Sequence, residues 1–541
     1  MLNFITGGVC AAQGFRAGGI HVGVKTHAAW KKDVALIVSD EDCACAAVYT
    51  KNAVKAAHIH VDKRHLAYGK ARAAVINSGN ANACAPMGEE NAERVCAAAG
   101  KALGCRPEDV VVAATGVIGQ TLNVAVIEQG MPELCAAAAH TAAGSDAAAH
   151  AIMTTDTVKK ELAVETVIGG KTVRMGGIAK GSGMIHPNMG TMLCFLTTDC
   201  AISSEMIKSA LLETVQVSFN RISVDGDTST NDTCCVLANG LAGNPVITEK
   251  GPDYDAFVEA LRALCVELAK KMASDGEGAT HLITCTVTGA GSEQSAETVA
   301  KSVIGSALTK AAIFGADANW GRVLCAMGYS GEDFNPDKVD VAFQSQAGSV
   351  QVCAKGRGLD FDEDLAKRVL TEHDVTIAIT MGEGDSSCTC WGCDLTYEYV
   401  KINGDYRTET GMPDSALAGS GDGPLSGGLS APRSGCICPV IIAAIPASHG
   451  TPPPPPAESR RFSRKELMLR CPPTHSRRGR LWKPCPISRN SPARPSWSST
   501  AATPWCPTNS AGLSCATSSC CPWLAFGWWW STAAGRRSAR C

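Results

Sequence analysis

Residues 176–199 read GGIAKGSGMIHPNMGTMLCFLTTD, and this stretch joins a glycine-rich loop directly to an apolar strand. The first half ends at HPN (186–188), where proline fixes φ and the glycines before it permit backbone angles that other residues avoid. The second half, from Thr191 to Thr197, is apolar and β-prone enough for a strand buried on both faces. Thr191 therefore stands where a loop enters a core strand.

A junction of this kind suits a chain that cuts itself. A strained turn between Gly190 and Thr191 would bring the Thr191 hydroxyl close to the Gly190 carbonyl. Attack there shifts the acyl group from nitrogen to oxygen, and water then hydrolyses the ester. The new chain starts at Thr191, whose α-amine has an ordinary pKa of about 8 and serves as base for its own hydroxyl. The plainer interpretation is an ordinary threonine at a loop-to-strand junction.

The rest of residues 1–411 predicts a layered α/β body, because short apolar runs alternate with alanine-rich helical stretches. The clearest examples are 34–38, 73–76 and 110–114 for strands and 89–103 for a helix. A further helix is expected over 254–273, where apolar residues recur every three or four positions and form one stripe. This stripe consists of Phe257, Leu261, Leu264, Leu268 and Met272.

Charge is unevenly distributed. Residues 412–541 hold 15 of the 49 Lys and Arg but only 4 of the 52 Asp and Glu, a formal charge of +11. Residues 1–411 hold 34 against 48, a formal charge of −14. An acidic body argues against a duplex nucleic-acid surface, which needs clustered basic groups. No run approaches the roughly 20 apolar residues that a spanning helix needs, so no membrane segment is expected.

The 27 cysteines could indicate either disulfides or free thiols. Residues 1–19 lack the basic flank and long apolar run of a secretory signal. We therefore expect a cytoplasmic protein whose thiols pack as small hydrophobes. Cys388, Cys390 and Cys393 have the close spacing of zinc ligands, but no second ligand pair lies nearby in the sequence, so no metal is expected.

Residues 412–541 differ in composition from the body. They hold 19 of the 26 prolines and 7 of the 10 tryptophans, and no apolar period persists. Such a segment cannot offset its ordering entropy by regular burial, so we expect disorder. One interpretation is a Pro-rich basic interaction tail. We favour the other, that the segment is not native coding sequence, as after a shifted reading frame, and assign it no role.

Seven stretches follow one another in the order of a known family. They are AVINSGNANAC (74–84), ATGVIGQTL (114–122), residues 176–199, SFNRISVDGDTSTND (218–232), SDGEGATHLI (274–283), FGADANWGRVLCAMGYSG (314–331) and WGCDLTYEYVKINGDYRT (391–408). On these motifs the chain resembles the ornithine acetyltransferases, also called glutamate N-acetyltransferases, over residues 5–410. The resemblance implies a layered α-β-β-α sandwich of the ornithine acetyltransferase and β-aminopeptidase type.

The resemblance also implies roles for single residues. Thr191 matches the nucleophile, and a cut after Gly190 would yield an α chain (1–190) and a β chain (191–411) that the family pairs as α2β2. Thr115 and Gly116 match the oxyanion-hole pair, where each donor is worth on the order of 3 kcal/mol. The plainer interpretation of this pair is a Thr-Gly turn after strand 110–114.

Further positions match residues that contact substrate. One cation, one anion and neutral donors suit N2-acetylornithine and glutamate, and Lys180 would lower the pKa of the nucleophile's amine by repulsion. Plainer interpretations are an exposed loop lysine, a glutamate in a glycine turn and a polar C-terminal strand. The matching residues are Thr154, Lys180, Thr191, Glu277, Asn403 and Thr408.

The implied reaction is ping-pong acetyl transfer without a resident cofactor. Thr191 takes acetyl from N2-acetylornithine, ornithine leaves, and glutamate accepts the group. The sequence leaves open whether acetyl-CoA also serves as donor. The main alternative is a self-cleaved aminopeptidase or amidohydrolase.

Two positions depart from the family pattern. Gly190 stands where alanine is usual, which should preserve cleavage at an altered rate. His281 stands where lysine is usual and is expected to change substrate affinity.

Overall fold

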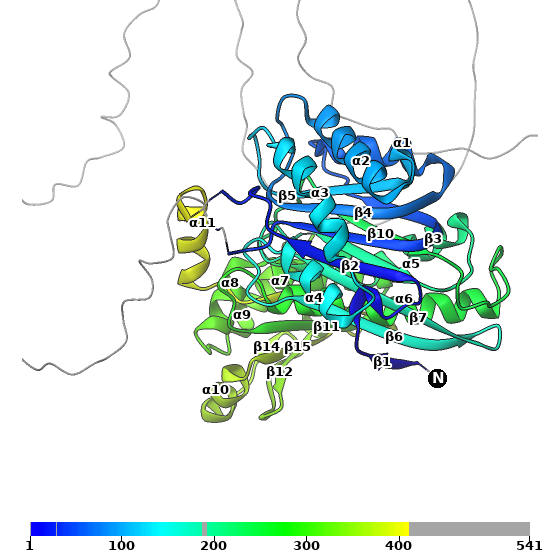
Figure 1. Cartoon of the computed structure of the whole chain (residues 1–541). Coiled ribbons are helices and arrows are strands. Elements are labelled where there is room, and N and C mark those ends of the chain that lie inside the picture. The colour runs from blue at the N-terminus through cyan, green and yellow to red at the C-terminus, as the bar shows by residue number, and fades with distance from the viewer. Residues whose placement is uncertain (1, 27, 29, 187–191, 410–541) are drawn as a thin grey trace, which may run out of the picture. The chain divides into compact units, whose positions relative to one another are not determined.

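The larger of two β-sheets carries most of the secondary structure before residue 240 (Figure 1). The structure is a computed structural model, and it describes residues 2–26, 28, 30–186 and 192–409. Gly190, Thr191 and the segment 412–541 therefore lie outside the described residues. The strand order is β1-β6-β7-β8-β10-β3-β4-β5, with β2 also paired to β3. The strands are β1 (Asn3–Ile5), β2 (Phe15–Ile20), β3 (Val34–Tyr49), β4 (Lys70–Asn80), β5 (Val110–Val117), β6 (Lys160–Ile168), β7 (Lys171–Lys180), β8 (Leu193–Thr198) and β10 (Thr233–Ala238).

The second sheet has seven strands and is built mostly from residues after 280. Its order is β14-β13-β12-β15-β11-β16-β9. The strands are β9 (Ile222–Ser223), β11 (Leu282–Ala290), β12 (Asp340–Ser345), β13 (Gly348–Ala354), β14 (Arg357–Gly358), β15 (Asp374–Thr380) and β16 (Ser386–Cys393). Two sheets with interleaved helices confirm the prediction of a layered α/β fold.

Helices cover both faces of the larger sheet. Among the described residues, the helices before residue 280 are α1 (Ala57–His65), α2 (Gly88–Leu103), α3 (Val124–Ala137), α4 (Ala142–Ile152), α5 (Ser204–Gln216) and α6 (Pro252–Ser274). The later helices are α7 (Glu293–Gly305), α8 (Ala307–Phe314), α9 (Trp320–Gly328), α10 (Glu363–Thr371) and α11 (Tyr397–Glu409), of which α7 to α10 contribute to the core of the second sheet. The central strand β8 shows why helices cover both faces of the larger sheet, since its side chains alternate between a core on one face and a core on the other. Leu193 and Phe195 pack in the core that includes α4, and Cys194 and Leu196 in the core that includes α6. The predicted strand after the HPN loop is therefore confirmed.

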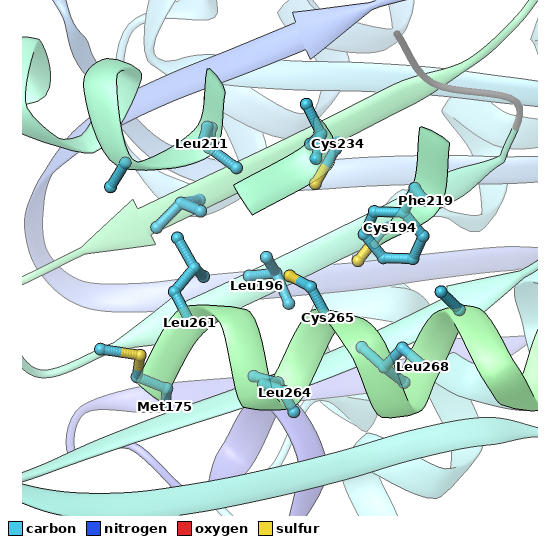
Figure 2. Close-up of a cluster of buried hydrophobic side chains, with 14 of the residues drawn as sticks. Met175, Cys194, Leu196, Leu211, Phe219, Cys234, Leu261, Leu264, Cys265 and Leu268 are labelled. Atoms are coloured by element: carbon cyan, nitrogen blue, oxygen red, sulfur yellow. The ribbon is translucent and has the colours of Figure 1, made fainter. Parts of the chain in front are cut away.

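The long helix α6 begins with Pro252, which suits the first turn of a helix, and with two acidic residues that favour a helix N-terminus. Its predicted apolar stripe is confirmed, since all five residues of the stripe are buried. Figure 2 shows Leu261, Leu264 and Leu268 of α6 in one apolar cluster with Leu196 of β8. Burying each such leucine contributes about 1.5–3 kcal/mol, so the stripe is what holds α6 on the sheet.

The other predicted elements are also confirmed. The runs 34–38, 73–76 and 110–114 lie in β3, β4 and β5, and 89–103 is contained in α2. The interpretation of Thr115 and Gly116 as a turn after strand 110–114 is wrong, because β5 continues to Val117 and holds both residues within the strand. The interpretation of Asn403 as part of a polar C-terminal strand is also wrong, because Asn403 lies in the helix α11.

Strands from both sides of the 187–191 segment pair with each other. β7 runs antiparallel to β8, with Lys180 opposite Leu193. β10 runs parallel to β8 and antiparallel to β3. Residues before and after the predicted cut therefore form one sheet, and two chains produced by a cut would remain joined by its hydrogen bonds.

The 18 cysteines among the described residues are free thiols. Cys388 and Cys390 are buried in the core of the second sheet, where thiols pack as small apolar groups. Within the described ranges, no group of three His, Cys, Asp or Glu side chains is placed to hold a metal ion. No helix among the residues that the structure describes is long and apolar enough to cross a membrane.

Candidate active site

A cavity of about 490 Å³ lies where several strands of the larger sheet end or begin. Its lining comes from the end of β5, the end of β7, the first residue of β8 and the segment before β10, with further residues from the loop before β11 and from α11. Six residues predicted from the sequence line it together: Thr115, Gly116, Thr154, Lys180, Glu277 and Asn403.

The remaining predicted site residues are not described. Gly190 and Thr191 belong to the segment outside the described residues, and the side chain of Thr408 is outside them as well. On either side of that segment, Ile185 and Met192 both line the cavity.

Gly116 is a position that only glycine can occupy. Its φ is +134°, a region that side chains with a Cβ rarely adopt. A Cβ built at Gly116 would lie 2.3 Å from the carbonyl carbon of Gly79 on the neighbouring strand β4. The register between β4 and β5 is irregular at the same point. The close approach of these strands leaves the Gly116 backbone facing the cavity without a side chain to cover it.

Thr115 has a defined hydrogen-bond arrangement. The Lys180 ammonium donates to the Thr115 hydroxyl oxygen at 3.3 Å. A hydroxyl that accepts from an ammonium keeps its own proton for donation. Thr115 is therefore prepared to donate to a negatively charged oxygen in the cavity, as an oxyanion-hole residue must.

Lys180 is the last residue of β7 and is only 8% exposed, so the interpretation as an exposed loop lysine is wrong. Burial lowers the pKa of Lys180 because the charged form loses hydration, while the Asp156 carboxylate acts in the opposite direction. A buried cation at the end of a strand needs such compensation.

Glu277 and Asn403 connect two elements that are distant in sequence. The Asn403 side-chain amide donates to the Glu277 carboxylate at 2.8 Å, and this ties α11 to the turn before β11. The Glu277 N–H in turn donates to the Ser182 carbonyl at 2.9 Å. A Cβ at Gly183 would lie 2.3 Å from the Glu277 carboxyl carbon, so that glycine makes room for it.

His281, one of the two departures from the family pattern, does not belong to the cavity lining. Its ring nitrogen lies 2.8 Å from the Asp394 carboxylate, and its backbone N–H donates to the same carboxylate at 3.1 Å. The expected change in substrate affinity would therefore have to act through the Glu277 turn, which begins four residues earlier.

Sequence reasoning assigned no role to several residues that shape the cavity. Asn231 donates from its side-chain amide to the carbonyls of Ala81 and Ala114 at 2.6 and 2.7 Å, directly beside Thr115. The buried Asp156 holds the segment that carries Thr154. In the sequence, these two residues could have been singled out only by their position, since Asn231 lies in the motif SFNRISVDGDTSTND and Asp156 in the run MTTDT.

Comparison with known proteins gives consistent matches. A model of the ArgJ family matches residues 16–408. The chain is 50% identical over 408 residues to the arginine biosynthesis bifunctional protein ArgJ of Symbiobacterium thermophilum, covering 75% of this chain and 100% of that relative. The protein of the same name from Bacillus subtilis is 45% identical over 406 residues, covering 75% and 97%. A solved ornithine acetyltransferase of Mycobacterium tuberculosis complexed with ornithine shares 36% identity and covers 35% of this chain and 100% of that chain, with a TM-score of 0.33.

Proposed function

The chain belongs to the ArgJ family. We propose that it cuts itself between Gly190 and Thr191 and then transfers the acetyl group of its donor substrate through Thr191. It is an acyltransferase of arginine biosynthesis, which transfers acetyl from N2-acetylornithine to glutamate. The observation that carries the proposal for Thr191 is the convergence of six predicted site residues on one cavity whose lining includes Ile185 and Met192.

Self-cleavage comes first. The Thr191 hydroxyl oxygen attacks the Gly190 carbonyl carbon, the peptide C–N bond breaks, and the released nitrogen takes a proton to become the α-amine. Water hydrolyses the resulting ester, which leaves a carboxylate on Gly190 and a free hydroxyl on Thr191. An N-terminal threonine whose own amine is the base is an established type of activated nucleophile.

Acetyl transfer then follows in two half-reactions. The Thr191 oxygen attacks the acetyl carbonyl of N2-acetylornithine while the α-amine takes its proton. The negative oxygen of the tetrahedral intermediate receives hydrogen bonds from the Thr115 hydroxyl and the Gly116 N–H, each worth on the order of 3 kcal/mol. Ornithine leaves with the proton on its nitrogen. The amine of glutamate attacks the acetyl-threonine ester by the same route and gives N-acetylglutamate.

Substrate recognition rests on complementary charge. Lys180 provides a cation for a substrate carboxylate and Glu277 provides an anion for a substrate ammonium, while Thr154, Asn403 and Thr408 provide neutral contacts. Asn403 is suited to this because its amide is already oriented by Glu277. The word bifunctional in the relatives' name supports a second donor, acetyl-CoA, that would charge the same threonine.

The proposal extends to assembly and location. The α chain (1–190) and the β chain, with its family-like part at 191–411, would assemble as α2β2. We place the enzyme in the cytoplasm, where a biosynthetic acyltransferase meets its amino-acid substrates.

The test is the change Thr191→Ala in the full chain. Intact-mass measurement and N-terminal sequencing should find the unmodified protein as two chains, one ending at Gly190 and one starting at Thr191. The variant should stay whole and form no N-acetylglutamate from acetylornithine and glutamate. Thr371→Ala is a matched control, because Thr371 is exposed on α10 and bonds only within that helix.

The same assay separates the alternatives. Acetate release that does not depend on glutamate would point to a hydrolase. N-acetylglutamate formed from acetyl-CoA without acetylornithine would establish the second donor. A Thr191→Ala protein that is still cut at the same bond would overturn the self-cleavage proposal.

A further inference from the structure

One buried amide beside the cavity connects the oxyanion-hole pair to the chain that follows the nucleophile. We propose that Asn231 is a positioning residue, whose side-chain amide holds Thr115 and Gly116 at a fixed distance from Met192. The inference rests on the proposed function, because only there do Thr115 and Gly116 stabilise a negative oxygen. Asn231 lines the cavity and is only 6% exposed, so its hydrogen bonds are shielded from water.

The Asn231 amide holds the backbone on both sides of the oxyanion-hole pair. Its Nδ2 donates at 2.7 Å to the carbonyl of Ala114, which belongs to the peptide group that leads into Thr115. The same nitrogen donates to the Ala81 carbonyl at 2.6 Å. The Ala81 N–H donates in turn to the Val117 carbonyl at 3.0 Å. The pair is therefore held at both ends, directly at Ala114 and through Ala81 at Val117.

The strand pairing is irregular at this place. β4 and β5 are parallel neighbours, and their register shifts between Gly79 and Asn80. A Cβ built at Gly116 would lie 2.6 Å from the Asn80 backbone nitrogen, so the two strands approach closely there. An irregular ladder leaves backbone groups that need partners from outside it. The two donor hydrogens of Asn231 serve both strands at this irregularity.

The hydrogen bonds of Asn231 also show that it is not a third oxyanion donor. Both of its acceptors are carbonyl oxygens, so the atom between them must carry two hydrogens, as the NH2 group of an asparagine does. The side-chain oxygen of Asn231 accepts the Thr230 hydroxyl, which fixes the same orientation of the amide. With both hydrogens engaged, Asn231 has none left for the tetrahedral intermediate and acts through Thr115 and Gly116.

The short segment that carries Asn231 is itself anchored. The N–H of Ala56, at the start of α1, donates to the Thr230 carbonyl at 2.9 Å. On the other side of Asn231, the Thr233 N–H donates to the Met192 carbonyl at 2.8 Å, where β10 runs beside β8. One segment therefore contacts both the oxyanion-hole pair and the residue directly after the nucleophile, and it sets the distance between them.

The test is Asn231→Leu, which keeps the branched shape of the side chain but removes both donors. A misplacement of about 1 Å can cost about 10²-fold in rate, so kcat should fall by roughly 10- to 10²-fold. KM for acetylornithine and for glutamate should stay within about threefold, because the negative oxygen forms only after binding. Asn231→Asp is the second variant and should show the same split, since its carboxylate would face two carbonyl oxygens.

Rates are normalised to the fraction of cleaved chain, measured by intact mass. A folded and cleaved variant with an unchanged kcat would overturn the inference. A loss that lies in KM alone would also overturn it, because Asn231 would then serve substrate binding and not the oxyanion-hole pair.

The matched control is Asn244→Leu. Asn244 is 5% exposed, and its Nδ2 donates to the carbonyls of Ala201 and Pro245 at 3.1 and 2.8 Å, but it does not line the cavity. Its loss should lower the melting temperature and leave kcat unchanged. Equal losses of kcat in Asn231→Leu and Asn244→Leu would refute the inference, since the loss of any buried amide would then be enough.

A double variant tests whether Asn231 acts through Thr115. Thr115→Val removes the hydroxyl donor, so a displacement of that residue can cost nothing further at the hydroxyl. The loss of kcat in Asn231→Leu/Thr115→Val should therefore be smaller than the product of the two single losses. A loss equal to the full product would refute the action through Thr115.

Hydrogen exchange gives a readout that needs no activity. Without the bridging amide, the segments 79–83 and 114–118 should exchange faster in Asn231→Leu, while exchange in α6 stays unchanged. Unchanged exchange in both segments would overturn the inference even in an active enzyme. Faster exchange in the variant, with no acetyl transfer by the unmodified protein, would support the positioning role and refute the proposed reaction alone.

Discussion

The strand β7 passes through two regions in which burial of a side chain has opposite energetic consequences. Its first half, at Val173 and Met175, packs in the apolar core beneath α6, where burial alone is favourable. Figure 2 shows Met175 in this cluster. The end of β7, at Lys180, buries a cation, which is unfavourable unless opposite charges and hydrogen bonds surround it. The first region needs apolar side chains of the right size. The second needs particular partners at particular distances, and this difference determines how each region should respond to change.

The largest expected effect is a combined loss of catalytic activity and of fold stability. Gly116→Ala should lower kcat/KM by about 10²–10³-fold, because it disturbs an oxyanion donor. It should also destabilise the fold, since the new Cβ would meet the Gly79 backbone and the positive φ is strained for alanine. Steady-state kinetics and thermal unfolding measure the two losses.

Gly104→Ala is the control for strain without a clash. Gly104 also has a positive φ, +71°, but nothing lies within 4 Å of a Cβ built there. It should lose a little stability and no activity. Equal activity losses in the two variants would mean that the position of Gly116 beside the cavity is irrelevant.

The next largest effect belongs to the apolar core. Leu264→Ala leaves a cavity beneath α6 and should reduce the free energy of unfolding by roughly 2–5 kcal/mol. Its kcat and KM should stay near those of the unmodified enzyme below the melting range, because α6 contributes no residue to the cavity lining. Denaturant unfolding with parallel kinetics measures both.

Leu212→Ala serves as its control, since Leu212 is 39% exposed on α5. It should cost much less stability. A large fall in kcat for Leu264→Ala, with the protein fully folded, would contradict the separation of core and site.

The smallest effect concerns pH. Burial lowers the pKa of His58 to about 4 from its usual value of 6.5, so the folded state keeps this ring neutral while the unfolded chain takes up a proton. Stability from this group is therefore complete above pH 6.5 and falls as the pH drops toward 4, by roughly 3 kcal/mol in all. Unfolding free energies measured across this range, for the unmodified protein and His58→Leu, test this.

The variant His58→Leu cannot take up that proton. Its stability should decline less steeply between pH 6.5 and 4, whatever its absolute value. Parallel slopes for the two proteins would show that His58 does not contribute to the acid sensitivity.

The sequence also predicts the apolar core beneath α6 better than it predicts the cavity. The stripe of α6 and the strand β8 were predictable, because apolar periodicity follows directly from the geometry of a helix and a strand. The cavity residues were predicted only through resemblance to a family, since an isolated Thr or Lys has no periodic signal. Asp156 was missed because its partners Gly181 and Lys160 meet only when β6, β7 and the loop before them have folded.

Sequence patterns by themselves determined the layered α/β body, the apolar helix at 254–273 and the apolar strand found at Leu193–Thr198, because local periodicity acts between near neighbours in the chain. Tertiary structure alone decided that Thr115 continues a strand, that Lys180 is buried beside it and that His281 pairs with Asp394 away from the cavity. The physical reason is that burial, counter-charge and close backbone approach depend on segments far apart in sequence, and their energies arise only once those segments pack.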